Sequence, residues 1–153
     1  MVVNWKNDNN VHIRHEGMKS AVMFTPSRWS SFHQSFDKID QQLYKRERGE
    51  HVNYRKHIGA GWYVSVSTKF PCVDIRKFDI SGEETDCKTI MDGIAIRLSE
   101  WTTLKQAVKR LHEDHPIANT FTPCSNNPDH NTPEGIASCM ECNISPIMSI
   151  TPM

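Results

Sequence analysis

The feature that most constrains how this 153-residue chain folds is an internal repeat. Residues 21–39 (AVMFTPSRWSSFHQSFDKI) align without a gap with residues 93–111 (GIAIRLSEWTTLKQAVKRL), and the offset is 72. Upstream, VHIR at 11–14 matches VDIR at 73–76 at an offset of 62, which also aligns Val2 with Val64. Because the motifs recur in the same order, the alignment indicates two related structural units.

Each unit reads as antiparallel strands followed by one helix. In the second unit, residues 62–67, 72–76 and 94–97 alternate between apolar and polar residues, which predicts half-buried strands. Apolar residues then recur at helical spacing, at Trp101, Leu104, Val108 and Leu111. The first unit repeats this pattern, with strands at 11–14 and 22–24 and helical spacing at Trp29, Phe32, Phe36, Ile39 and Leu43.

The ends of the first helix are well marked. Thr25 is the expected N-cap and Pro26 the first helical residue, because proline at that position loses no hydrogen bond. The basic residues of 45–48 suit the negative end of the helix dipole, and Gly49 suits a helix stop. We therefore expect one continuous helix between Thr25 and Gly49.

A unit of about 50 residues buries too little surface to be more than marginally stable alone. We expect an α+β fold in which two antiparallel sheet-plus-helix units pack as an intramolecular pseudo-dimer, with the helices buried between the sheets and a flexible C-terminal tail. The expected boundaries are 1–49 for the first, N-terminally shortened unit, 50–61 for a linker, 62–115 for the second unit and 116–153 for the loop-rich tail. Tyr54–Ile58 are expected to add a leading strand to the second unit.

Charge and composition restrict the function classes. The formal net charge is zero, but residues 1–115 carry +3 and the tail carries −3, which permits a phosphate-binding body. There is no apolar run of the length that a membrane span needs, and the polar start is unlike a signal peptide. Five cysteines without a secretory context favour a reduced intracellular protein.

No catalytic constellation is recognisable, so we expect a non-enzymatic protein, with a cryptic enzyme as the least favoured alternative. His112 and His115 have i,i+3 spacing, which suits either a metal or the cation-favouring end of a helix. Basic and aromatic side chains interleave on the strands, as a single-stranded nucleic-acid surface requires. The DNA-binding candidates among them are Lys6, Arg14, Lys69, Phe70, Arg76 and Lys77, and the competing interpretation is that the aromatic residues belong to the core.

Three motifs in order, WYVSVS at 62–67, VDIRKF at 73–78 and GIAIRLSEW at 93–101, resemble the transcriptional coactivator family of positive cofactor four, the p-fifteen-type coactivators of RNA polymerase II. The resemblance covers about residues 58–114, and VHIR and FTPSRW extend it more weakly into the first unit. Tandem copies are also a feature of purine-rich-element-binding proteins, whose motifs are less similar.

The resemblance implies four antiparallel strands and a helix per unit, pairing of units, and binding of single-stranded or melted DNA. It places base stacking on Trp101 and Trp29, an aromatic contact near Phe70 and a basic contact at Lys19. Both tryptophans have an alternative role, which is to anchor their helices on the sheets. The implied context is nuclear transcription regulation together with proteins of the transcription machinery, and further dimerisation is an open possibility.

The tail contains Cys124, His130, Cys139 and Cys142, spaced C-x5-H-x8-C-x2-C. Thiolate and imidazole are zinc ligands, and the C-x2-C pair is suitable for half a site. The alternative is a set of thiols in a flexible tail. The second function hypothesis is accordingly a protein-interaction module that kept the fold, lost strong DNA binding and contacts its partner through the acidic tail or a zinc knuckle.

Overall fold

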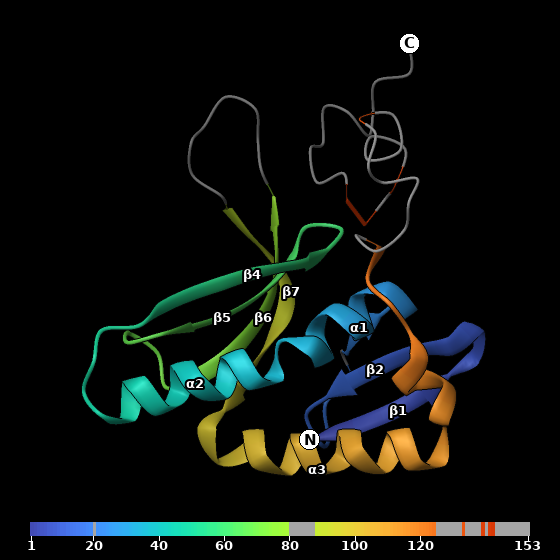
Figure 1. The fold of residues 1–153 in the computed structure, drawn as a ribbon, viewed down its shortest axis with the longest axis horizontal. Coiled ribbons are helices and arrows are strands. Elements are labelled where there is room, and N and C mark those ends of the chain that lie inside the picture. Colours follow the sequence, from blue (N-terminus) through green and yellow to red (C-terminus); the bar gives the residue numbers. More distant parts are fainter. Residues whose placement is uncertain (20, 80–87, 125–132, 134–138, 140, 143–153) are drawn as a thin grey trace.

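The computed structural model describes residues 1–19, 21–79, 88–124, 133, 139 and 141–142. It is an α+β fold with two antiparallel sheets and three α-helices in the described part (Figure 1). The first sheet has the order β1 (Val2–Lys6), β2 (Asn10–Arg14), β3 (Val22–Phe24). The second has the order β4 (Asn53–Gly59), β5 (Trp62–Ser67), β6 (Cys72–Asp79), β7 (Lys88–Arg97). The expected leading strand is therefore present as β4.

Strand pairing follows the aligned motifs in both sheets. Val11 pairs with Phe24 and Ile13 with Val22 in the first sheet. The positions aligned with them pair in the same way in the second sheet, Val73 with Ile96 and Ile75 with Ile94. All eight side chains are buried, because the pleat turns alternate residues to the same face.

The alignment of Val2 with Val64 is wrong by one residue. Val3, not Val2, lies opposite Ile13, whereas Val64 lies opposite the aligned Ile75. A one-residue slip would turn every side chain of a strand to the other face, and the register observed places Val3 against the core. The hairpin between β1 and β2 absorbs the difference in the 3-10 turn η1 (Asn7–Asn9).

The first helix begins as expected and is then interrupted. The Thr25 hydroxyl accepts a hydrogen bond from the Arg28 amide, and Pro26 opens α1 (Pro26–Gln34). The expectation of one continuous helix is wrong, because Ser35 separates α1 from α2 (Phe36–Glu47). The buried Ser35 hydroxyl donates to the Phe32 carbonyl at 2.6 Å, a local bond that competes with the helical ladder and bends the axis.

The other helix ends match their sequence signals. After α2, the Gly49 amide donates to the Arg46 carbonyl and the Glu50 amide to the Lys45 carbonyl, which is a Schellman motif with Gly49 at φ 86°. The last helix, α3 (Leu98–Asp114), follows β7 directly. Pro116 then opens the 3-10 helix η2 (Pro116–Thr120).

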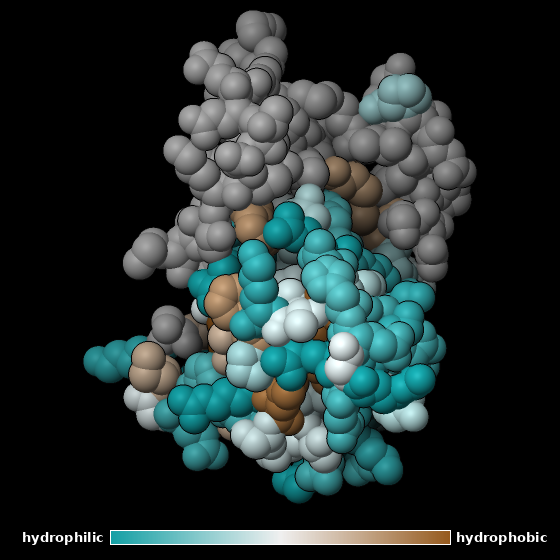
Figure 2. All heavy atoms as spheres, turned by 90° about the vertical axis from the view of Figure 1, so that its left-hand side faces the viewer, coloured by the Kyte–Doolittle hydropathy of each residue, from teal (hydrophilic) through white to brown (hydrophobic). Residues whose placement is uncertain are grey.

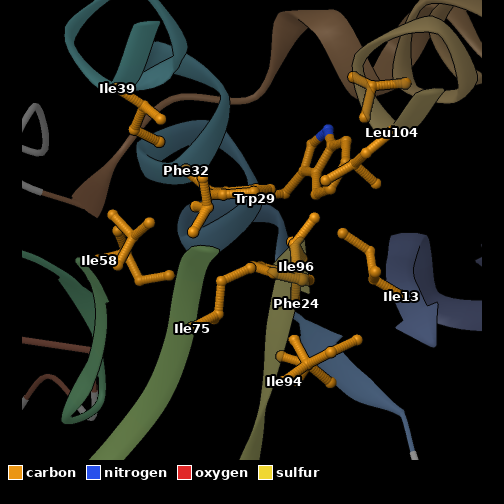
Figure 3. Close-up of a cluster of buried hydrophobic side chains, with 14 of the residues drawn as sticks. Ile13, Phe24, Trp29, Phe32, Ile39, Ile58, Ile75, Ile94, Ile96 and Leu104 are labelled. Atoms are coloured by element: carbon orange, nitrogen blue, oxygen red, sulfur yellow. The ribbon is translucent and has the colours of Figure 1, made fainter. Parts of the chain in front are cut away.

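One apolar cluster joins both sheets and all three helices. In Figure 3, Trp29 and Phe32 of α1 lie over residues of both sheets, Ile13 and Phe24 of the first and Ile75 and Ile96 of the second. Each of these side chains is at most 1% exposed. Helices also pack on the sheet of the other sequence unit, since α1 contacts β4, α2 contacts β5 and α3 contacts β1.

The start of the tail packs on the body. Ala118 of η2 is buried, and the Phe121 carbonyl accepts a hydrogen bond from the Ser30 hydroxyl of α1 at 2.8 Å. The rings of His115 and Phe121 stack on Trp5 with centroid distances of 4.7 and 6.2 Å. None of the described helices has the length and apolar character needed to cross a membrane.

Candidate functional site

A cavity lies over the outer face of the second sheet, the face turned away from the core. Its volume is about 720 Å³. It is lined by polar, cationic and aromatic side chains that alternate along the strands with the buried ones. We call it the sheet groove and define it by Arg55, Ser65, Lys69, Phe70, Arg76 and Phe78.

Phe70 and Lys69 enter the groove from the β5–β6 turn, where the predicted Phe70–Pro71 connection lies. The Phe70 ring is 63% exposed, the highest value among the exposed large apolar side chains of the described chain. Thr68 fixes the turn, because its amide donates to the Val52 carbonyl at 2.9 Å and its hydroxyl accepts from the Val52 amide at 2.7 Å. The groove therefore has an exposed ring on an anchored turn.

A second aromatic group lies at the other end of the groove. The Arg55 guanidinium lies 4.5 Å from the centroid of the Phe78 ring and 5.9 Å from that of Tyr63. The two rings meet edge to face at 5.4 Å. Arg55 is exposed, so these contacts orient its guanidinium without removing it from solvent.

Arg76 lies between the two aromatic groups and is neutralised in part. Its Nε donates to both carboxylate oxygens of Asp74 at 3.1 Å. Gly93 on β7 allows this placement, because a Cβ there would lie 2.7 Å from the Arg76 Cγ. Among the arginine and lysine side chains that the structure describes in the groove, the unpaired positive charges are therefore those of Arg55 and Lys69.

The structure does not bring all the predicted DNA-binding residues together. Lys69, Phe70 and Arg76 line the groove, whereas Lys77 lies opposite Trp62 on the other face of the strand. The remaining three cations belong to the first unit: Lys6 on β1, Arg14 on β2 and Lys19 in the turn that follows.

The expectation that Trp29 and Trp101 stack on bases is wrong for this structure. Trp29 is 0% exposed and Trp101 is 3% exposed, so neither ring presents a face to a ligand. Their indole N–H groups are also engaged, from Trp29 to His112 Nε2 at 3.0 Å and from Trp101 to Asp40 Oδ1 at 2.8 Å. Both residues therefore fit the alternative interpretation, in which they anchor their helices on the sheets.

The Trp29 contact belongs to a histidine pair between α1 and α3. The rings of His33 and His112 lie 4.6 Å apart at an interplanar angle of 88°. Burial is the main cause that lowers the pKa of His112 to about 4, and the electrostatic effect of His33 is the second cause. Burial also lowers the pKa of His33, which Asp37 partly offsets. His112 is therefore a neutral acceptor at physiological pH. The ring of His115, the other histidine of the i,i+3 pair, stacks on Trp5.

Three of the four predicted zinc ligands lie together. The Sγ atoms of Cys124, Cys139 and Cys142 lie within 4.8 Å of one another, and those of Cys124 and Cys142 are 3.1 Å apart. Burial, together with hydrogen bonds to the other two thiols, raises the pKa of Cys142 to about 12. The fourth predicted ligand, His130, lies outside the described residues. This cysteine cluster could hold a metal ion.

Sequence reasoning did not identify Arg55, Tyr63 and Phe78 as site residues. The alternation of Tyr63, Ser65 and Ser67 against buried valines was the available signal, since it marks one face as solvent-facing. This alternation does not show that Arg55 and Phe78 lie beside that face. Their position follows from the strand order, in which β4 and β6 are the two neighbours of β5.

The chain matches no family model, no curated protein and no solved structure. The resemblance to the positive cofactor four coactivators therefore rests on the sequence motifs at 62–67, 73–78 and 93–101.

Proposed function

We propose that this protein binds single-stranded or melted DNA along the sheet groove, as a non-enzymatic regulator of transcription in the nucleus. The observation that carries the proposal is the exposed Phe70 ring in one groove with Lys69, Arg55 and the Phe78 ring. Aromatic rings stack on bases and cations follow the phosphates, at about 1–3 kcal/mol per stacked base. A role as an RNA polymerase II coactivator rests on the motif resemblance.

The proposed architecture is the tandem pseudo-dimer. The matched strand pairing of Val11–Phe24 and Val73–Ile96 supports it, and so does the packing of α1 on β4 and of α3 on β1. In such an arrangement the two units stabilise each other, as a unit of about 50 residues requires. The sheet groove lies on the second sheet, so we assign the DNA contact to that unit.

The experiment is a titration of labelled oligonucleotides, single- and double-stranded, monitored by fluorescence polarisation at two salt concentrations. We expect single-stranded DNA to bind preferentially and more weakly at high salt. Phe70→Ala should weaken binding about 5- to 150-fold, the range that one lost stacking contact of about 1–3 kcal/mol gives. Lys109→Ala, an exposed lysine on α3 outside the groove, is the matched control. Absence of binding at low salt would refute the proposal.

The second candidate is a protein-interaction module, and two observations favour it. Trp29 and Trp101 are buried, and Asp74 partly neutralises Arg76 in the groove. Figure 2 shows that the end of the molecule facing the viewer is mostly hydrophilic, with isolated apolar residues. A partner of the transcription machinery would then contact a polar surface or the tail. If the Phe70→Ala protein no longer binds DNA but still binds such a partner, the two functions are separate.

We further infer that the ion held by the cysteine cluster is zinc. Tetrahedral zinc lies about 2.3 Å from each thiolate sulfur, which places the sulfurs about 3.8 Å apart. That separation falls between the 3.1 Å that separates the sulfurs of Cys124 and Cys142 and the 4.8 Å that bounds all three. Three sulfur donors also suit zinc better than magnesium or calcium, which prefer oxygen.

A further inference from the structure

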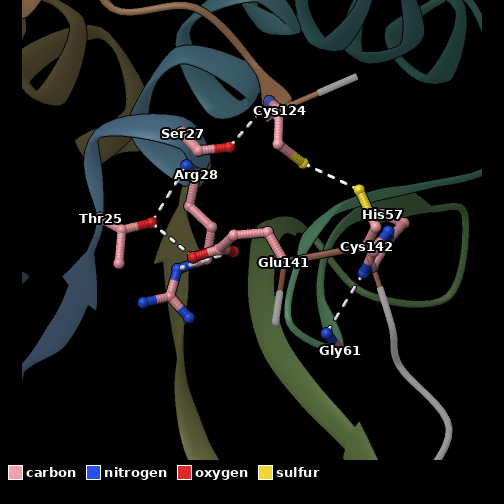
Figure 4. A network of polar contacts seen from close by, with 8 residues as sticks. All are labelled: Thr25, Ser27, Arg28, His57, Gly61, Cys124, Glu141 and Cys142. Carbon is pink, nitrogen blue, oxygen red and sulfur yellow. Dashed lines mark hydrogen bonds and ion pairs between the residues drawn. The ribbon is translucent and has the colours of Figure 1, made fainter. Parts of the chain in front are cut away.

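The cysteine cluster lies where the tail meets both sequence units. Cys124 is held on α1, because its amide donates to the Ser27 hydroxyl at 2.9 Å. Cys142 lies beside it, and the intervening Glu141 reaches from the cluster toward the start of α1 (Figure 4). Cys124 follows η2, and Cys139 and Cys142 lie 15 and 18 residues further along the chain. The cluster thus brings these two segments of the tail together.

Glu141 makes contacts with both units. Its Oε1 accepts from the Thr25 hydroxyl, the N-cap of α1, at 2.7 Å. Its backbone carbonyl accepts from the Ala60 amide in the β4–β5 turn at 2.8 Å. Gly59 leaves room for the side chain, since a Cβ there would collide with Glu141 Oε2. One residue of the tail therefore links the first turn of α1 to the hairpin that opens the second sheet.

This arrangement includes a buried charge pair with incomplete bonding. Arg28 is 7% exposed, and its Nε lies 3.7 Å from Glu141 Oε2. Neither of these two atoms has a hydrogen-bond partner. Burial lowers the pKa of Arg28, and Glu141 partly offsets that effect. Burying such a pair costs free energy that the contacts of Glu141 with Thr25 and Ala60 must offset, and an interaction at the flanking cysteines would add to them.

We propose that a zinc ion bound by Cys124, Cys139 and Cys142 staples the tail across α1 and the β4–β5 turn and thereby holds Glu141 against Thr25, Arg28 and Ala60. The proposal rests on the inference that the cluster binds zinc. Zinc binding to thiolates contributes directly to folding stability, and here it also closes the chain between Cys124 and Cys139. The staple connects the two units through the tail, in addition to their shared apolar core.

The test uses the full chain, purified under reducing conditions, with and without zinc. Elemental analysis should give stoichiometric zinc, and cobalt substitution should give the absorption bands of tetrahedral thiolate coordination. Removal of zinc by a chelator should increase amide exchange at Ala60 and Cys124 about tenfold or more, because the Ala60 amide loses its acceptor on Glu141 and the Cys124 amide moves away from its acceptor on Ser27. Exchange at Val64 and Ile75, within the second sheet, should stay unchanged.

Matched variants separate the two levels of the proposal. Cys124→Ser and Cys142→Ser should lose zinc, whereas Cys72→Ser, a cysteine of the sheet groove, should keep it. Glu141→Gln should keep stoichiometric zinc and lower the melting temperature. If the reduced protein binds no zinc, the zinc inference and the staple both fail. If it binds zinc and exchange at Ala60 does not respond to the chelator, the staple alone is refuted.

Discussion

A tryptophan in the first turn of a helix can face a ligand or the core, and its neighbours decide which. Trp101 packs against Phe36 at 5.1 Å, and its indole N–H donates to Asp40, which Lys105 also contacts at 3.0 Å. The same residue type at Trp29 is enclosed by Phe24 and Phe32. Both rings are therefore parts of the core between the helices and sheets.

This burial gives a residue-scale prediction for Trp101. Trp101→Ala should lower the free energy of unfolding by about 3–5 kcal/mol, the range for large-to-small core substitutions. Trp101→Phe should cost less, because a phenyl ring leaves a smaller cavity than a methyl group, while Asp40 keeps Lys105 as a partner in both variants. Chemical denaturation measures both. Wild-type stability of Trp101→Ala together with lost DNA binding would contradict the anchor role and restore the stacking role.

The residue scale also shows where sequence reasoning ends. The apolar spacing identified Trp29 and Trp101 as equivalent positions, and that equivalence is retained in their burial. Their hydrogen-bond partners, His112 and Asp40, lie 83 and 61 positions away. No local pattern reports such contacts, so the sequence left the choice between stacking and anchoring open.

At the scale of elements, the contact between α1 and α3 is sensitive to pH. Trp29 Nε1 donates to His112 Nε2, so a proton on that nitrogen would remove the acceptor. The surrounding groups are His33 on α1, Asp37 on α2, and Lys105, Lys109 and Glu113 on α3. Because the folded-state pKa of His112 is about 4 against 6.5 for the free side chain, the unfolded chain binds more protons between these values.

We therefore expect stability to fall as the pH drops from about 6.5 toward 4, with full stability above that window. His112→Gln should flatten this dependence, since the glutamine carbonyl accepts from Trp29 and does not titrate. The lowered pKa of His33 should leave a smaller residual slope. Melting temperatures across the window measure the effect, and an identical fall in both proteins would contradict it.

A second prediction at this scale concerns the start of α1. Thr25→Ala removes the N-cap and should cost about 1 kcal/mol of stability, and it also removes the hydroxyl that donates to Glu141. Thr25→Ser keeps both hydrogen bonds and is the control. Equal stability of the two variants in thermal denaturation would show that the cap does not contribute.

Elements were predictable to the extent that their signals are local. Alternation identified the strands of the second sheet, and Thr25, Pro26 and Gly49 marked the helix ends. The break at Ser35 was not predictable, because the apolar spacing of Phe32, Phe36 and Ile39 continues across it. A buried hydroxyl that bonds to the Phe32 carbonyl bends the helix without altering that spacing.

At the scale of the molecule, the two function hypotheses differ in electrostatics. The net charge of zero allows only a local cationic surface, and the sheet groove provides one through Arg55, Lys69 and the partly neutralised Arg76. Single-stranded DNA releases about 0.7 counterions per phosphate contacted. Two or three cations therefore predict a slope of about −1.5 to −2 for log affinity against log salt concentration.

Arg55→Ala should make this slope less negative by about 0.7, whereas Phe70→Ala should weaken binding and leave the slope unchanged, because stacking releases no counterions. Asp74→Asn should strengthen binding, since it frees the Arg76 guanidinium from its carboxylate partner. Polarisation titrations at four or more salt concentrations would measure all three. A slope that Arg55→Ala does not change would show that the DNA contacts lie outside the groove. The remaining predicted cations there are Lys77 of β6 and, in the first unit, Lys6, Arg14 and Lys19.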